Sequence, residues 1–119
     1  KFEKADSLQA LDKAIAQAGN SGKKVMLDFY ADWCTDCLRM ETTTFQDPGV
    51  IAALRAYRVL KVDVTDPDDR EGAAIKKRYG VFGPPAILFF DADGREYETE
   101  RRYGFVSADA LVAVLNTLE

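Results

Sequence analysis

The residues of this chain best suited to chemistry are its two cysteines, Cys34 and Cys37, which are three positions apart. The chain contains no histidine, so Ser-His and Cys-His nucleophilic pairs and histidine-ligated metals are excluded. Three positions are close to one helical turn, and the two sulfurs can therefore close a disulfide with little movement of the backbone. Such a pair stores two electrons. Cys34 would exchange with a partner's disulfide or thiolate, and Cys37 would resolve the mixed disulfide.

The position of Cys34 also favours a thiolate. It comes just after an apolar segment at 25–30 and just before a run of good helix formers, so the pattern predicts it in the first turn of a helix. Unpaired backbone N–H groups and the helix dipole stabilise an anion at that place. We therefore expect Cys34 to be the exposed nucleophile and Cys37 to be the resolving thiol.

Three other uses of the cysteine pair stay open at this point. A purely structural disulfide is one, although so short a loop constrains the unfolded chain little. A zinc site needs four ligands as a rule, and this chain offers one cysteine pair, so a two-cysteine copper site is the only metal alternative. A binding module that holds peptides would not need redox cycling. We expect neither a metal nor a bound organic cofactor.

Two carboxylates are candidates for proton transfer. Asp28 interrupts an apolar segment that reads as a central strand, where a buried unpaired carboxyl raises its own pKa and can shuttle a proton. We assign it as the acid/base for Cys37, with a solvated or hydrogen-bonded structural aspartate as the alternative. Glu41 lies four residues after Cys37 and seven after Cys34, so helical periodicity places it on their face. The alternative for Glu41 is an ordinary exposed helix residue.

Further negative charge surrounds the cysteines. Asp32 and Asp36 lie within a few residues of Cys34, and Arg39 is the one cation close by in the sequence. Negative neighbours oppose a thiolate, which makes the reduced form less favoured and the couple a better electron donor. We hypothesise that the chain is a reductant. The alternative is that both aspartates are screened surface charges with little effect.

The elements that must position these residues follow from periodicity and from Gly, Pro and capping residues. We expect helices over about 8–18, 34–43, 48–54 and 70–79 and after Ser107, and strands over 25–30, 59–64, 86–90 and 96–103. Helical crossovers favour parallel pairing of the first three strands, and a turn at Gly94 makes the last one an antiparallel edge. The order predicts an α/β sandwich with a central mixed sheet of about four to five strands flanked by helices.

Length and charge bound the class of protein. With 119 residues, of which 47% are hydrophobic, the chain is expected to be a single domain over 1–119. A net charge of −4 argues against nucleic acid or an anionic membrane as a partner. No apolar run approaches the roughly 18–20 residues of a spanning helix, so no direct membrane insertion is expected. Because the sequence starts at Lys1 without a targeting segment, we expect a domain excised from a larger protein.

Several segments together resemble a known family. Residues 28–37, with 83–86 further on, are similar to the active-site motifs of the thioredoxin superfamily, and the element order agrees with that fold along nearly the whole chain. More narrowly, the blocks 25–34, 41–48 and 84–91 resemble the C-terminal periplasmic domain of the DsbD family of thiol:disulfide interchange proteins. Three blocks in register are more specific than a bare Cys-X-X-Cys motif.

The resemblance implies a protein-disulfide reductase that works as a relay. It implies electrons taken from the transmembrane domain of the same parent protein and passed to its N-terminal domain, on the periplasmic side of a bacterial inner membrane. Cytosolic thioredoxin would be the original donor, and periplasmic disulfide isomerases and cytochrome c maturation thioredoxins the final acceptors. A free-standing thioredoxin-like reductase would share all the residues argued above and stays open as the alternative.

The resemblance also assigns the residues that meet a partner. Pro85 matches the position of the family's cis-proline, which packs beside the disulfide and aligns a substrate chain. Pro84 departs from the common pattern because it has no N–H. It can therefore contribute at most its carbonyl group to a strand-like contact with a partner. Trp33, Thr35 and Asp36 complete the expected partner-binding set. For Trp33, packing against its own chain is the alternative to partner contact.

Overall fold

The most apolar segments of the chain form the centre of a five-stranded sheet. The computed structural model describes residues 2–118, and its strands are β1 (Phe2–Lys4), β2 (Lys24–Tyr30), β3 (Tyr57–Asp63), β4 (Ala86–Phe90) and β5 (Arg102–Tyr103). The order across the sheet is β1-β3-β2-β4-β5. All five residues of β4 and the five inner residues of β2 are buried, as expected for strands that are covered on both faces. The sheet is therefore the middle layer of an α/β sandwich.

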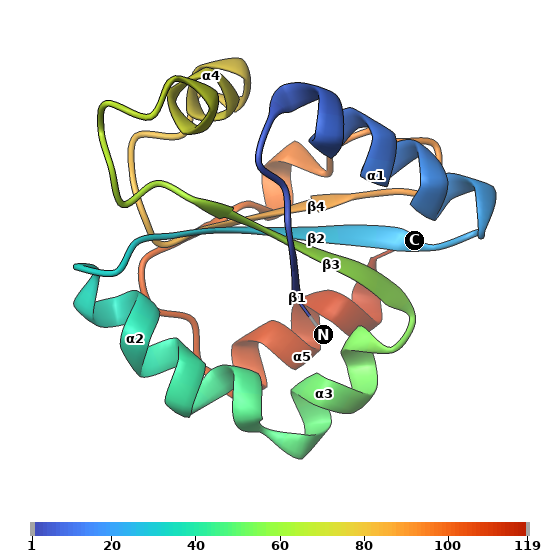
Figure 1. Cartoon of the computed structure of the whole chain (residues 1–119). Coiled ribbons are helices and arrows are strands. Elements are labelled where there is room, and N and C mark those ends of the chain that lie inside the picture. Colours follow the sequence, from blue (N-terminus) through green and yellow to red (C-terminus); the bar gives the residue numbers. More distant parts are fainter. Residues whose placement is uncertain (1, 119) are drawn as a thin grey trace.

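Helices cover both faces of the sheet. Figure 1 shows α1 and α4 on one side and α2, α3 and α5 on the other. The helices are α1 (Leu8–Asn20), α2 (Thr35–Thr42), α3 (Pro48–Leu54), α4 (Arg70–Tyr79) and α5 (Ala108–Thr117), with the short 3-10 segments η1 (Thr44–Gln46) and η2 (Glu98–Glu100). Among residues 2–118, no helix is both long and apolar enough to cross a bilayer.

The helix boundaries follow the capping residues. The Ser7 hydroxyl accepts a hydrogen bond from the Ala10 N–H at 3.0 Å, and Ser107 does the same for α5. Asp47 caps α3, whose first residue is Pro48. Helix α4 ends at Gly80, which takes a left-handed conformation with φ of 64°. These starts and stops confirm the helices expected from the sequence, except that α1 continues past the expected end at residue 18 to Asn20.

Alternation along the strands divides the core into two clusters. Leu27 and Phe29 point to the α1 and α4 side, in a cluster that also contains both cysteines. Met26 lies on the opposite side with Phe89 and Leu111. Because Asp28 is two residues from Met26, its side chain belongs to the face covered by α2, α3 and α5.

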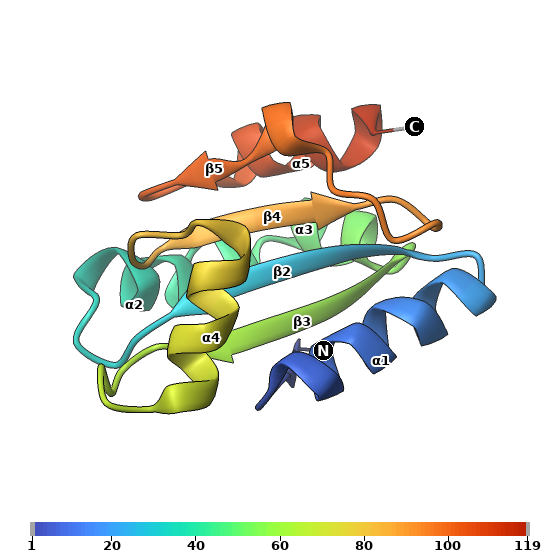
Figure 2. The same cartoon turned by 90° about the horizontal axis from the view of Figure 1, so that it is seen from above.

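The expectation that the first three predicted strands are parallel is wrong. Strand β3 is parallel to β2, but β4 is antiparallel to it, with Asp28 opposite Ile87. The reason is the course of α4, which lies across the strands and does not run back along them (Figure 2). The chain therefore enters β4 near the end at which β2 leaves the sheet, so that the segment before Ala86 is close to the cysteines.

Two further details differ from the expectation. The predicted strand over 96–103 is reduced to an isolated bridge at Glu96 and the two residues of β5, with η2 between them. The Arg101 guanidinium makes two bonds to the Glu96 carboxylate, at 2.5 and 2.8 Å, which draw this segment into a loop. Strand β1 was not expected, because three residues are too few to show a period. It pairs in parallel with β3 at the sheet edge.

Candidate functional site

The two cysteines are joined by a disulfide at the start of α2. Their Cα atoms are 5.2 Å apart. Cys34 is the N-cap of the helix, and its Sγ accepts a hydrogen bond from the Cys37 N–H at 3.1 Å. The first sulfur is thus held against the unpaired N–H groups of the helix, where a thiolate would also be stabilised.

The expectation of an exposed Cys34 is wrong for this disulfide form. Both cysteines are buried where α2 begins at the end of the sheet, in the same core cluster as Val81 and Ala86. Cys34 is covered because it is bonded to Cys37 and packs in this cluster. A partner must therefore approach closely to reach the sulfur.

The loop before Cys34 is fixed to the end of β3 by Thr65. The Asp32 N–H donates to Thr65 Oγ1 at 2.9 Å, and the Trp33 indole N–H donates to the Thr65 carbonyl at 3.0 Å. The Trp33 side chain is nevertheless 63% exposed. Its polar edge is anchored while much of its apolar surface is available to a partner. Thr65 was not identified from the sequence, where it is one residue of a polar loop.

Asp28 is a buried carboxyl in the middle of β2. Only 7% of the residue is exposed. Burial raises the pKa of Asp28 from 3.8 to about 7, with Glu41 adding to the rise and Lys61 opposing it. A group with that pKa exchanges its proton near neutral pH, as a proton shuttle requires. The sequence-based expectation of a buried carboxyl with a raised pKa is confirmed.

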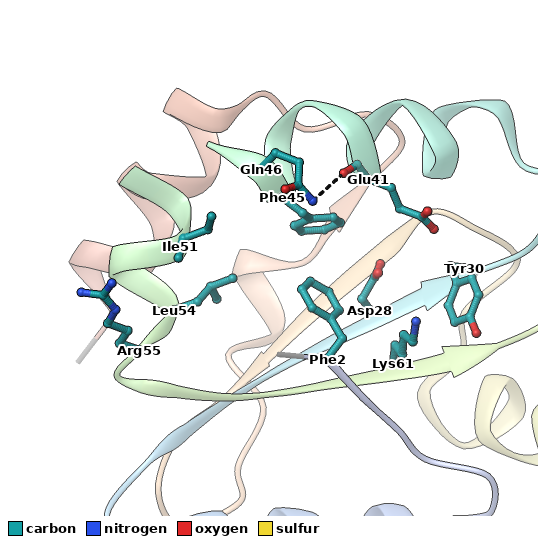
Figure 3. A pocket seen from close by; sticks show the side chains of 10 residues that line it. All are labelled: Phe2, Asp28, Tyr30, Glu41, Phe45, Gln46, Ile51, Leu54, Arg55 and Lys61. Atoms are coloured by element: carbon teal, nitrogen blue, oxygen red, sulfur yellow. Dashed lines mark hydrogen bonds between the residues drawn. The ribbon is translucent and has the colours of Figure 1, made fainter. Parts of the chain in front are cut away.

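Glu41 and Asp28 both line a groove between the sheet and the helices α2 and α3. The groove has a volume of about 630 Å³ and is lined by Phe2, Asp28, Tyr30, Glu41, Phe45, Gln46, Ile51, Leu54, Arg55 and Lys61. Figure 3 shows the Glu41 carboxylate reaching from α2 toward the Asp28 carboxyl on β2. Glu41 is exposed to water, whereas Asp28 is not. The pair therefore connects a buried carboxyl to the surface.

Lys61 is the functional neighbour that the sequence did not identify. It lies directly opposite Asp28 in the parallel β2–β3 pairing, and its ammonium group is 4.9 Å from the centre of the Tyr30 ring. Its charge lowers the pKa of Asp28 and limits the effect of burial. The alternation of polar and apolar residues along β3 placed Lys61 on one face of that strand. The register that brings Lys61 opposite Asp28 cannot be read from the sequence of either strand alone.

The segment before β4 carries two of the predicted partner-binding residues. The Pro84–Pro85 peptide bond is cis, and Pro85 is buried while Pro84 is half-buried. The Pro85 carbonyl accepts a hydrogen bond from the Gly104 N–H at 3.0 Å. Phe82, in the same segment, is 97% exposed and was not singled out from the sequence. It is a second large apolar side chain at the end of the sheet where the cysteines lie.

The charges near the cysteines are mostly negative. Asp32, in the loop before Cys34, is exposed, and Asp36, in the first turn of α2, is partly exposed, as is usual for surface carboxylates; Thr35 is exposed beside them. The Arg39 guanidinium lies over the Phe105 ring, 3.6 Å from its centre. The one nearby cation of the sequence is thus engaged with the loop before α5. Within residues 2–118, no group of three or more His, Cys, Asp or Glu side chains is arranged to hold a metal ion.

Comparison with known proteins gives consistent results. Residues 11–119 match the family described as a thioredoxin-like domain. The chain is 44% identical over 114 residues to the thiol:disulfide interchange protein DsbD of Ralstonia nicotianae, covering 96% of this chain and 18% of that protein. It is 43% identical over 117 residues to DsbD of Haemophilus ducreyi, covering 98% of this chain and 20% of that protein. The chain thus spans about one fifth of the length of these relatives.

Solved structures show the same relationship. The reduced C-terminal domain of DsbD from Neisseria meningitidis superposes with a TM-score of 0.82 at 35% identity, covering 100% of both chains. The oxidised form of the same domain gives 0.81 at 36% identity, with 93% of this chain and 95% of that one covered. A thioredoxin from Thermus thermophilus gives 0.77 at 29% identity over 98% of this chain and 84% of that one.

Proposed function

The chain belongs to the thioredoxin-like domain family and, within it, to the C-terminal domains of the DsbD proteins, and from this premise we propose that it is a protein-disulfide reductase module that relays electrons inside a larger protein. The observation that carries the proposal is the Cys34–Cys37 disulfide at the first turn of α2. A disulfide there can be opened by a thiolate and closed again by the second cysteine.

The reaction proceeds by two exchanges. In the reduced chain, the Cys34 thiolate attacks one sulfur of the acceptor's disulfide, a mixed disulfide forms, and the acceptor's other sulfur leaves as a thiolate. Cys37 then loses its proton and attacks Cys34 Sγ, which releases the second acceptor sulfur and forms the Cys34–Cys37 disulfide. Two electrons pass to the acceptor, and two protons complete its two thiols. A donor dithiol reduces the Cys34–Cys37 pair again by the same steps in reverse.

Asp28 is the proposed proton carrier for Cys37. With its pKa raised to about 7, Asp28 takes up the Cys37 proton as the thiol becomes a nucleophile. It returns the proton when a donor reduces the Cys34–Cys37 disulfide again. Glu41, at the surface end of the groove, exchanges that proton with water. Burial of the disulfide and of Asp28 supports this assignment, because bulk water has little access to either group.

Partner recognition is assigned to the surface around the disulfide. Trp33 offers an exposed apolar face, Thr35 and Asp36 lie on the first turn of α2, and Pro84 and Pro85 lie before β4. We assign the donor to the transmembrane domain and the acceptor to the N-terminal domain of the parent protein, on the periplasmic side of the inner membrane. Cytosolic thioredoxin and the periplasmic isomerases and cytochrome c maturation thioredoxins are its indirect partners. The name of these relatives, thiol:disulfide interchange protein, supports exchange with partner thiols and disulfides, and the routing among partners follows from the family resemblance.

Trapping the mixed disulfide tests the reductase activity. A C37A variant keeps the nucleophile but cannot resolve, so it should accumulate as a covalent adduct with a disulfide-containing acceptor, seen by mass spectrometry and removed by dithiothreitol. The matched C34A variant should give no such adduct. If C37A binds an acceptor only non-covalently, the chain is a peptide-binding module and not a reductase.

A further inference from the structure

Two aromatic rings cross the groove beside Asp28. Phe2 comes from β1 and Phe45 from η1, and their ring centres are 4.8 Å apart at an angle of 68°. In Figure 3 the two rings stand between the Asp28 carboxyl and the far part of the groove, where Ile51, Leu54 and Arg55 lie. Asp28 and the residues beyond the rings line one groove, and the two rings narrow it between them.

Hydrogen bonds fix the two segments that carry these rings. Phe2 pairs with Val59 in the β1–β3 ladder, and the Ala5 N–H donates to the Lys61 carbonyl at 2.9 Å just beyond the strand. Phe45 follows α2 directly, and the neighbouring Gln46 side-chain amide donates to the Glu41 carbonyl at 3.1 Å. The edge strand and the end of the active-site helix therefore meet through these two rings.

We propose that Phe2 and Phe45 are positioning residues of the redox site, forming a wall that keeps water in the distant part of the groove away from the Asp28 carboxyl. This rests on the proposed function, in which Asp28 carries the proton of Cys37. It gives the short strand β1 a role in the chemistry, because one of its three residues supplies half of the wall.

The charges around Asp28 determine how its pKa would change if one of the two rings were removed. Lys61 faces Asp28 from β3 and Glu41 from α2, while Arg55, the C-cap of α3, lines the groove beyond the rings. Tyr30, on β2 itself, stays neutral because burial and nearby carboxylates raise its pKa to about 12. Water admitted beside Asp28 would hydrate its charged form, and Lys61 would add to that effect. The pKa of Asp28 should therefore fall.

The test compares F2A with the wild-type chain in the disulfide form. The pKa of Asp28, followed by the NMR shift of its carboxyl carbon, should drop by about one unit or more in F2A. F2L, which keeps an apolar side chain of similar reach, should restore most of the value. I51A is the matched control, because it removes apolar bulk from the groove on the far side of the rings. It should leave the pKa of Asp28 unchanged.

A kinetic readout separates a positioning role from simple packing. The pH profile for oxidation of the reduced chain by glutathione disulfide should move to lower pH in F2A, and F2A should not move it in a D28N background. If F2A does not fold, F2V replaces it, since valine suits an edge strand but removes the ring. A folded variant in which the pKa of Asp28 is unchanged overturns the proposal that the two rings exclude water from Asp28. If the pKa of Asp28 falls but the pH profile for oxidation does not move, the two rings do exclude water from Asp28, and the proton-transfer role of Asp28 is refuted.

Discussion

At the scale of single residues, Asp28 should make the chain less stable as the pH rises. Its pKa is about 7 in the folded chain and near 3.8 when it is exposed. Between these values the unfolded chain has lost the proton and the folded chain has kept it, so the free energy of unfolding falls with pH and levels off above about 7. The difference in pKa corresponds to a fall of up to about 4 kcal/mol.

The D28N variant should remove this decline. Urea denaturation of the disulfide form at several pH values between 4.5 and 8 measures it, and the variant should gain stability over the wild type as the pH rises. D32N, a change of the same kind at an exposed position, is the control and should follow the wild-type curve. Parallel curves for D28N and the wild type would mean that Asp28 is not held protonated by burial.

The two charged neighbours of Asp28 should shift its pKa in opposite directions. Glu41 raises that pKa and Lys61 lowers it. E41Q should therefore lower the pKa of Asp28, and K61Q should raise it, because each removes one charge and keeps a similar side-chain length. Titration of the Asp28 carboxyl carbon by NMR measures both. Shifts in the same direction in the two variants would show that the charges act through the fold and not on Asp28 directly.

Individual residues differed in how far the sequence could identify them. The burial of Asp28 was predictable, because a single carboxyl within an apolar central strand is carried into the core with its neighbours. Lys61 was not, because its position opposite Asp28 depends on the register between two strands. Phe2 was missed because it lies in a strand of three residues. Cys34 was wrongly expected to be exposed because the core cluster that contains it includes Val81 and Ala86, which are distant in the sequence.

At the scale of elements, the contact between α1 and the loop after β4 should limit substitution at Gly19. A Cβ on Gly19 would collide with the Ala92 carbonyl oxygen, which belongs to the backbone and cannot simply rotate away. G19A gains up to about 1 kcal/mol in helix propensity, but overpacking costs about 1–3 kcal/mol. We expect a net loss of about 1 kcal/mol in the free energy of unfolding.

Urea denaturation measures this loss, with G83A as the control. A Cβ at Gly83 would meet open space, so that variant should retain the wild-type stability within about 0.5 kcal/mol. A stabilised G19A would show that the loop at Ala92 moves aside freely and that helix propensity decides the outcome.

The elements themselves were largely predictable, and their pairing was not. Helix ends at Ser7 and Gly80 follow from residues that act locally. The direction of β4 depends on how α4 crosses the sheet, which is a property of packing between distant segments. The strand expected over 96–103 failed for a similar reason, since the ion pair between Glu96 and Arg101 favours a loop there.

At the scale of the whole molecule, charge and exposed surface suit a protein partner. The net charge of −4 gives no attraction for nucleic acid or an anionic membrane. The exposed apolar side chains Trp33 and Phe82 lie instead at the end of the sheet where the disulfide is buried. Docking through this surface would cover the sulfur and exclude water during exchange. Resemblance to DsbD, and not composition, supplies the identity of the proposed partners.

The direction of electron flow depends on the equilibrium reduction potential of the Cys34–Cys37 pair. Titration against a thiol buffer, with mass or Trp33 fluorescence as the readout, gives the value. The negative surroundings of Cys34 predict a potential near that of thioredoxin, about −270 mV, as an electron donor requires. A value near −120 mV, typical of a strong periplasmic oxidant, would rule out a role as electron donor, because the chain would then withdraw electrons from its partner.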